Sequence, residues 1–356
     1  ALAIRQRLAE KNPDRFEPGY ATSLSNYASY LSDEGNNEEA LINAKAALAI
    51  RQRLVEKNPD RFEPDYATSL SNYANHLGAV GNNEKAVSHA KEALAIRQRL
   101  AEKNPDRFEP DYATSLSNYA GYLSNEGNNE EAIINAKAAL AIRQRLVEKN
   151  PDRFEPNYAM SLGNYASHLS DVGNNEEAII NAKEALAIWQ RLAQKTPARY
   201  EVTYYYSCCN VLFFNWLGNE TLTNPEMQEA ITKLPSTMTD YQKASCLFQF
   251  HFVQACVAAT LTQQAEQFKQ VLEQSRALSK SDQHAMQDYF LSSCAWLQHH
   301  EPTALTDIDW VDNWQQFQQQ RQNRLPQWML TLAQRLHFEF PEPSLFNKAD
   351  CLTHSS

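Results

Sequence analysis

The sequence predicts an all-α protein, a solenoid of stacked helical hairpins that ends in an irregular helical cap, and three observations lead to this prediction. The string ALAI returns at residues 1, 47, 93, 139 and 185, which is a strict period of 46. Each period carries two apolar stripes with helical spacing. Glycine, which sheets and nucleotide-binding α/β folds need for turns and phosphate loops, makes up only 9 of 356 residues.

Four complete repeats follow from this period. Residues 15–60 and 107–152 differ at only four positions, so we expect them to have the same structure. One repeat of this size cannot bury its own apolar face and must stack on its neighbours. The chain therefore divides into the end of a second helix (1–14), four repeats (15–60, 61–106, 107–152 and 153–198), a degenerate fifth first helix (199–224), a helical C-terminal cap domain (225–340) and a tail (341–356).

The first half of each repeat predicts a helix over about 18–33, in the numbering of the first repeat. Pro18 suits a first helical turn, where its missing N–H costs nothing. Gly35 suits the left-handed position that ends a helix. The apolar stripe between them consists of Tyr20, Leu24, Tyr27, Ala28 and Leu31.

The second half predicts a helix over about 37–57. Asn36 with Glu39 forms an N-cap and a possible capping box. Asn58-Pro59 stops the helix, because proline disfavours helical geometry in the residue before it. The stripe along this helix consists of Ala40, Ala44, Ala47, Ile50 and Leu54.

The period is lost after a fifth first helix, which we expect at about 201–217. This helix carries an aromatic run, Tyr204 to Tyr206 with Phe213, Phe214 and Trp216. The run either seals the array against the cap or forms an aromatic hot spot for a partner. Within the cap we expect helices at 225–234, 240–261, 263–279, 281–299, 309–324 and 326–338, with starts at Thr239-Asp240 and Ser281-Asp282.

The spacing of small residues in each hairpin resembles a known family. Ala28, Gly35, Ala40 and Ala47 have the spacing of the small residues of the tetratricopeptide repeat, and large residues such as Leu24 stand where its first helix has them. The family's usual unit has about 34 residues, so the extra length is expected in the second helix and its following loop. The sequence is similar to the long kinesin-light-chain-like repeats of bacterial proteins over residues 1–218. This resemblance implies a right-handed superhelix that binds a protein or peptide in its concave groove.

The resemblance also assigns residues of the first helix to that groove. An asparagine amide can donate and accept, so a row of amides can bind an extended main chain without requiring one sequence. The alternative is that these asparagines hydrogen-bond the neighbouring helix. The predicted binding residues are the ladder Asn26, Asn72, Asn118, Asn164 and Asn210, with Asn75, Ser25, Ser71 and Ser117, next to Thr22, Thr68 and Thr114.

Lysine and arginine are absent from these groove positions, so capture of a peptide carboxylate is not expected. The net charge of −10 argues against nucleic-acid or anionic-membrane partners. The oligomeric state is not assigned by the sequence.

Motifs for catalysis or cofactor binding are absent. The sequence contains no phosphate-binding loop, dinucleotide fingerprint, zinc-protease motif or nucleophile elbow, so we expect neither an enzyme nor a cofactor or metal site. His299-His300 before Glu301 reads as a solvated helix end, since adjacent helical residues diverge. A cysteine–histidine pair drawn from residues 200–340 is the catalytic alternative, with candidates Cys246, Cys256, Cys294, His251 and His284.

All six cysteines follow residue 200 and none forms a C-x-x-C pair, which predicts buried thiols in a reducing, cytoplasmic compartment. The leading functional hypothesis is a non-enzymatic scaffold for protein–protein interaction. The alternative is a sensor or recruitment arm of a larger bacterial signalling ATPase or caspase-like protease system. Because residues 1–14 repeat residues 93–106, we also expect the array to continue upstream.

Overall fold

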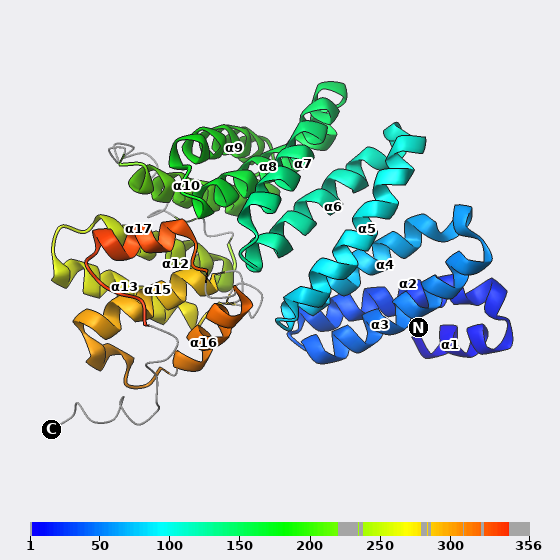
Figure 1. The fold of residues 1–356 in the computed structure, drawn as a ribbon, viewed down its shortest axis with the longest axis horizontal. Helices are drawn as coiled ribbons and strands as arrows, with labels where there is room; N and C mark the ends of the chain where they lie inside the picture. Colours follow the sequence, from blue (N-terminus) through cyan, green and yellow to red (C-terminus); the bar gives the residue numbers. More distant parts are fainter. Residues whose placement is uncertain are drawn as a thin grey trace. The chain divides into compact units, whose positions relative to one another are not determined.

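The computed structural model describes residues 2–219, 234, 238–278, 283, 286–308, 310–321 and 324–341, and all regular elements in these ranges are helical. The chain forms two compact units, residues 1–149 and 150–356. The N-terminal unit consists of consecutive helical hairpins (Figure 1). Its helices are α1 (Leu2–Lys11), α2 (Pro13–Asp33), α3 (Asn37–Lys57), α4 (Pro59–Ala79), α5 (Asn83–Lys103), α6 (Pro105–Asn125) and α7 (Asn129–Lys149).

The first helix of each repeat begins earlier than the sequence predicted. Helix α2 starts at Pro13, and Pro18 lies inside it instead of in its first turn. The side-chain oxygen of Asn12 accepts a hydrogen bond from the Arg15 backbone N–H at 3.3 Å, which caps the earlier start. Proline in the first position again lacks only an N–H that would be unpaired.

One residue joins each repeat to the next. Asn58, with φ −152° and ψ 86°, both ends α3 and caps α4 through its side chain, which accepts from the Arg61 N–H at 3.2 Å. The prediction of a longer loop after the second helix was therefore wrong. The extra residues of the repeat extend both helices to 21 residues each.

Inside each hairpin the predicted small residues are buried. Ala28 and Ala40 are fully buried and Ala47 is 1% exposed, so the two helices approach closely. Gly35 adopts the predicted left-handed conformation, with φ 78°. Asn174 of the fourth repeat caps α9, since its side-chain oxygen accepts from the Glu177 N–H at 3.4 Å and its amide donates to the Glu177 carboxylate at 2.9 Å. This is an N-cap without the reciprocal backbone bond of the predicted capping box, and Asn36 forms no side-chain cap.

Neighbouring first helices meet at an aromatic position. Tyr122 of α6 lies against Gly78 of α4, where an added Cβ would come within 3.3 Å of the ring. The Tyr122 hydroxyl also donates to the side-chain oxygen of Asn75. In sequence, this position alternates between Tyr30, His76 and Tyr122 along the unit. The Tyr122 ring therefore faces Gly78, whereas the other repeats have serine at the position of Gly78 (Ser32, Ser124 and Ser170).

The C-terminal unit combines the last repeat with a helical bundle. The predicted starts and ends in the bundle are right to within a few residues where the structure describes them, and Thr239 forms a capping box with Gln242. The predicted helix 225–234, except for Leu234, lies outside the described residues, as do the predicted start at Ser281-Asp282 and the tail beyond Pro341. The helices are α8 (Pro151–Asp171), α9 (Asn175–Lys195), α10 (Pro197–Leu217), α12 (Asp240–Val257), α13 (Leu261–Ser275), α15 (Gln287–His300), the 3-10 helix η1 (Pro302–Leu305), α16 (Val311–Gln320) and α17 (Gln327–Arg335).

The aromatic run on α10 packs the last repeat against this bundle. Phe213 is 3% exposed, and its ring packs edge-on against Phe252 and Trp328 at centroid distances of 5.8 and 5.4 Å. Arg335 of α17 stacks over Trp216 and donates to the carbonyl of Leu217 at 2.8 Å, close to the end of α10. Of the two predicted roles for the run, the contact with the cap is the one observed.

Candidate functional site

The N-terminal unit carries three rungs of the predicted asparagine ladder on equivalent turns of α2, α4 and α6. Asn26 is exposed, and Asn72 and Asn118 are half-buried, as are Ser25, Ser71 and Ser117. Within the described part of the chain, the side chains of these three asparagines form no hydrogen bond. The alternative prediction was that these asparagines hydrogen-bond the neighbouring helix, and no such bond is present among the described residues. The donors and the acceptor of each amide are therefore unused by the residues that the structure describes.

Asn75 differs from the rungs of the ladder. It is exposed, but its side-chain oxygen accepts the hydroxyl of Tyr122 on the next first helix. No described residue accepts from its amide N–H groups, and the bond from Tyr122 fixes their direction.

The two rungs in the C-terminal unit have different surroundings. Asn164 on α8 is exposed, like Asn26. Asn210 on α10 is half-buried and lines a cavity of about 10 Å³ together with Gln249 and Tyr289 of the bundle. This volume is near the minimum for one water molecule. Of these two rungs, Asn164 is the exposed one and Asn210 faces the bundle.

A row of buried arginines lies beside the ladder, and sequence analysis missed it. Arg51, Arg97 and Arg143 of the second helices are 5–8% exposed. Arg97 donates to Ser115 of the next repeat at 2.7 Å and to Thr68 of its own repeat at 3.2 Å. Burial lowers the pKa of Arg97, and the nearby Asp111 opposes that effect.

The same contacts recur along the row. Arg51 donates to Thr22 at 2.7 Å and pairs with Asp65, and Arg143 donates to Thr114 at 3.3 Å. The threonines that the sequence placed in the groove therefore hold a buried cation. A signal was present in the sequence, because the fourth repeat replaces threonine and arginine together, by Met160 and Trp189.

Four titratable side chains form a cluster in the C-terminal unit. Burial, with Arg321 nearby, lowers the pKa of His168 to about 4. Burial also raises the pKa of Asp288 to about 6; Arg321 opposes this and Asp171 adds to it. Arg321 is 8% exposed and stacks on Phe317 at 5.2 Å. Because these residues come from α8, α15 and the end of α16, their sequence spacing gave no sign of the cluster.

The catalytic alternative receives no support from the thiols. Cys208, Cys209, Cys246, Cys256 and Cys294 are buried and unbridged, as predicted, and Cys351 lies outside the described residues. Burial raises the pKa of Cys208 to about 11 and that of Cys256 well above its ordinary value, which disfavours the thiolate. His251 hydrogen-bonds Gln267 at 2.8 Å, and His284 is not described.

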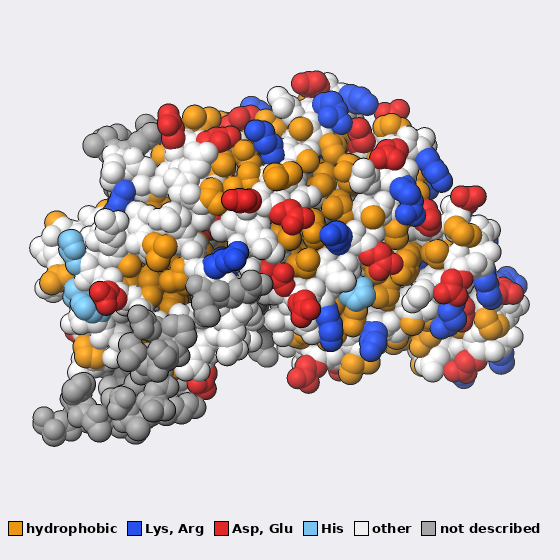
Figure 2. Space-filling model, viewed as in Figure 1, with side chains coloured by type: hydrophobic (Ala, Val, Ile, Leu, Met, Phe, Trp, Pro, Cys, Tyr) orange, Lys and Arg blue, Asp and Glu red, His pale blue; other side chains and the backbone are white. Residues whose placement is uncertain are grey.

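Metal and membrane features were searched over the described ranges. No group of three or more histidine, cysteine or acidic side chains there could hold a metal ion. Glu301, next to the two histidines at the end of α15, pairs with Lys269 at 2.7 Å. In the same ranges, no helix has the length and apolar character needed to cross a bilayer. On the face in Figure 2, acidic and basic side chains are interspersed over the N-terminal unit.

Comparisons with known proteins agree with the repeat period. The family model described as tetratricopeptide repeat matches residues 19–99, 65–145 and 111–191. A search of curated proteins gave no match.

Solved structures with the same kind of fold include a Rap protein complexed with competence and sporulation factor, with a TM-score of 0.55, 16% identity, and coverage of 90% of this chain and 77% of that one. A Podosopora anserina putative kinesin light chain with nearly identical TPR-like repeats has a TM-score of 0.46 and 19% identity, covering 68% of this chain and 99% of that one. BtubC from P. vanneervenii has a TM-score of 0.41 and 19% identity, covering 70% of this chain and 92% of that one. The likeness to the Rap protein extends to the fold alone.

Proposed function

Because residues 19–191 of this chain are tetratricopeptide repeats, we propose that it is a non-enzymatic scaffold that binds a protein partner through an extended segment laid across α2, α4 and α6. The observation that carries the proposal is the set of equivalent amides at Asn26, Asn72 and Asn118, none of which bonds a described residue. Each amide can donate to a peptide carbonyl and accept from a peptide N–H.

The neighbouring charges favour recognition of the main chain over recognition of charged side chains. The cation of Arg51 is neutralised by Asp65, and that of Arg97 is held by Ser115 and Thr68. The hydroxyls of Thr22 and Thr68 are already engaged by these arginines. The ligand therefore meets mainly neutral amides and serine hydroxyls, which read the backbone of an extended segment.

Affinity capture from the native cell tests this proposal. We expect the triple variant Asn26→Ala, Asn72→Ala, Asn118→Ala to lose the partner that the parent protein captures. The matched control is Asn43→Ala with Asn135→Ala, because these asparagines on the second helices only bond their own helix, at 2.9 and 2.8 Å. A triple variant that melts like the parent and captures every partner unchanged refutes the binding surface.

The alternative role, as a recruitment arm of a larger signalling ATPase or caspase-like protease system, stays a prediction from sequence. It requires an attached catalytic domain, so reading the full coding sequence decides it. The cytoplasmic location is likewise a proposal, supported by five buried, unbridged thiols. Cell fractionation with a tagged chain tests it.

A further inference from the structure

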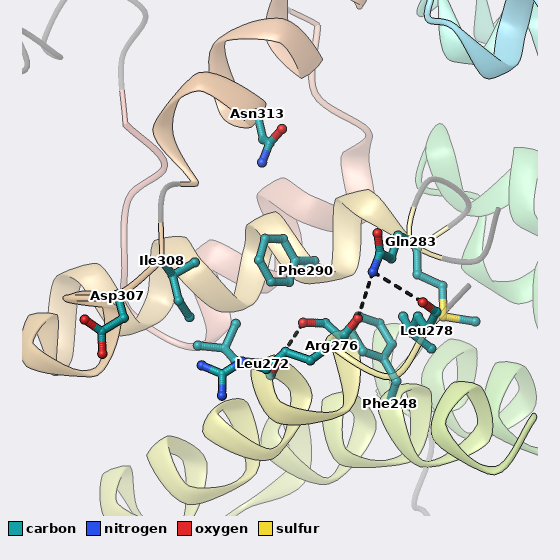
Figure 3. Close-up of a pocket in the computed structure, with 11 residues that line it drawn as sticks. Phe248, Leu272, Arg276, Leu278, Gln283, Phe290, Asp307, Ile308 and Asn313 are labelled. Carbon is teal, nitrogen blue, oxygen red and sulfur yellow. Dashed lines mark hydrogen bonds between the residues drawn. The ribbon is translucent and has the colours of Figure 1, made fainter. Parts of the chain in front are cut away.

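A cavity of about 360 Å³ lies inside the C-terminal bundle (Figure 3). It is bounded by the end of α13, the beginning of α15, the turn after η1 and the first turn of α16. Small-molecule sites span roughly 300–1,000 Å³, so the cavity is large enough for a compact ligand.

The floor of this cavity is apolar and fixed in place. Phe248, Leu272 and Met286 are 0%, 5% and 7% exposed, and Phe290 and Ile308 are half-buried beside them. Such a lining binds a large apolar group because it removes that group from water.

The wall formed by the end of α13 is held by hydrogen bonds. The Gln283 amide donates to the carbonyls of Ser275 and Leu278 at 3.2 and 3.3 Å, and the Ser275 hydroxyl donates to the Leu272 carbonyl at 2.7 Å. They add to the backbone bond from the Leu278 N–H to the Ser275 carbonyl at 3.3 Å and close the turn after α13. The cavity is therefore preorganised on this side.

The rim carries one cation and one anion. Arg276 and Asp307 are exposed and lie on the same side of the cavity, and Asn313 extends toward it from α16 (Figure 3). Neither Arg276 nor Asp307 forms an ion pair with any residue that the structure describes. Two opposite charges thus stand beside an apolar cavity without neutralising each other.

We propose that this cavity binds a free α-amino acid with a large apolar side chain. The ligand carboxylate pairs with Arg276, its ammonium group with Asp307, and its side chain enters the apolar floor. A fatty acid would place its carboxylate near Asp307, and a simple amine would place its charge near Arg276, so a zwitterion satisfies both rim charges where either single-charge ligand meets a like charge. This site is separate from the proposed peptide surface.

Isothermal titration calorimetry with the whole chain tests the proposal, using L-phenylalanine, 3-phenylpropanoate and phenethylamine as probes. We expect L-phenylalanine to bind at one site, roughly tenfold or more tightly than either single-charge analogue. Equal binding of the three probes, preference for 3-phenylpropanoate, or no binding at millimolar concentration would each overturn it.

Charge variants on the rim sharpen this test because both positions are exposed and tolerate substitution. We expect Arg276→Gln to weaken the binding of L-phenylalanine about tenfold, so that L-phenylalanine no longer binds more tightly than phenethylamine. We expect Asp307→Asn to remove its advantage over 3-phenylpropanoate. Glu273→Gln, an exposed acid nearby that does not line the cavity, is the control and should bind like the parent. Unchanged discrimination in both rim variants would refute the assigned contacts.

The triple asparagine variant separates the two proposals. It should bind L-phenylalanine with the affinity of the parent protein, because its substitutions lie in the other unit. A failure at the cavity therefore leaves the peptide surface standing, and the converse also holds.

Discussion

Arg97 shows how one residue couples successive repeats. Its guanidinium is 8% exposed, and it bonds Thr68 of its own repeat and Ser115 of the next. A buried cation without such partners is strongly destabilising, so each partner must be present. The coupled change to Met160 and Trp189 in the fourth repeat is what this dependence leads us to expect.

We expect Arg97→Ala to lower the free energy of unfolding by about 2 kcal/mol, because the side chain loses buried packing and leaves two hydroxyls without their donor. Importing the fourth-repeat pair, Thr68→Met with Arg97→Trp, should recover part of this loss. Urea unfolding measures both. Arg99→Ala is the matched control, since its pair with Glu63 is exposed on the arginine side and should cost under about 1 kcal/mol. If the double variant is less stable than Arg97→Ala, the two positions do not act as an exchangeable pair.

The cluster around Asp288 predicts two opposing effects of pH on the C-terminal unit. The pKa of Asp288 is raised to about 6, so its ionised form destabilises the fold, and acidification from pH 6 toward 4 is stabilising. The pKa of His168 is lowered to about 4, so acidification from pH 6.5 toward 4 is destabilising. In the parent protein these slopes offset each other.

Single variants should expose each slope. With Asp288→Asn we expect higher stability than the parent at pH 7 and a steeper fall toward pH 4. With His168→Gln we expect stability to rise from pH 7 to pH 4 relative to the parent. Urea midpoints from tryptophan fluorescence at four pH values give the comparison. Three parallel pH profiles would show that neither group titrates as described.

At the scale of the helix, the sequence allowed prediction of hairpins, caps and the small residues between helices, because these depend on local spacing. It misplaced the start of every first helix, because Pro18 resembles a first-turn proline and the true first-turn proline, Pro13, stands in the stop signal of the previous helix. Asn58 is both the C-cap of α3 and the N-cap of α4. A sequence search that expects a loop between a helix stop and the next helix start assigns it the first role alone.

The binding surface was predictable only in part for a related reason. The rungs of the ladder follow from the period, so Asn26, Asn72 and Asn118 could be placed on equivalent turns. The buried arginines were missed, because arginine is usually exposed and its partners, such as Ser115 for Arg97, lie in another repeat. Their one sequence signal was the joint change to Met160 and Trp189 in the fourth repeat. The surroundings of Asn210 depend on the bundle, which has no period.

Arg335 of α17 contacts the end of α10, beside the packing of Trp328 on Phe213. Its guanidinium donates to the carbonyls of Trp216 and Leu217 at the end of α10. The Trp216 carbonyl also accepts the Asn219 N–H at 3.2 Å, and the Leu217 carbonyl accepts the Asn175 amide at 3.2 Å. We expect Arg335→Ala to destabilise the C-terminal unit by about 1–3 kcal/mol and to speed amide hydrogen exchange in α17. Arg324→Ala, an exposed arginine without a described side-chain bond, should leave both unchanged. Equal rates of amide hydrogen exchange in α17 in the two variants would refute this structural role of Arg335.

At the scale of the molecule, the repeats are alike but not fully interchangeable. Tyr122 fits between first helices because it faces Gly78 and bonds Asn75. The corresponding residues of the first repeat are Ser32 and Ser29. A repeat with tyrosine at the position of Tyr122 therefore packs best after a repeat that has glycine and asparagine at the positions of Gly78 and Asn75.

Deleting residues 61–106 tests this preference. We expect the shortened array to stay helical and cooperative, because contacts are between neighbours and Arg51 meets Asp111 in place of Asp65. It should nevertheless be less stable, since Tyr122 then overpacks Ser32 by about 1–3 kcal/mol. Adding Ser32→Gly with Ser29→Asn should restore the lost stability. Circular dichroism melts of the two shortened chains measure it, and identical melts would mean that the facing residue is immaterial.

The invariant period of 46 residues also sets how the repeat array responds to tension. A hairpin that is pulled open releases 46 residues of chain, which is about 160 Å of extended contour. Because one residue joins successive helices across repeats, there is almost no slack between them to lengthen first. Under force, the N-terminal repeats should therefore unfold one at a time with equal gains in length. Each unfolding event must break the arginine contacts between successive repeats.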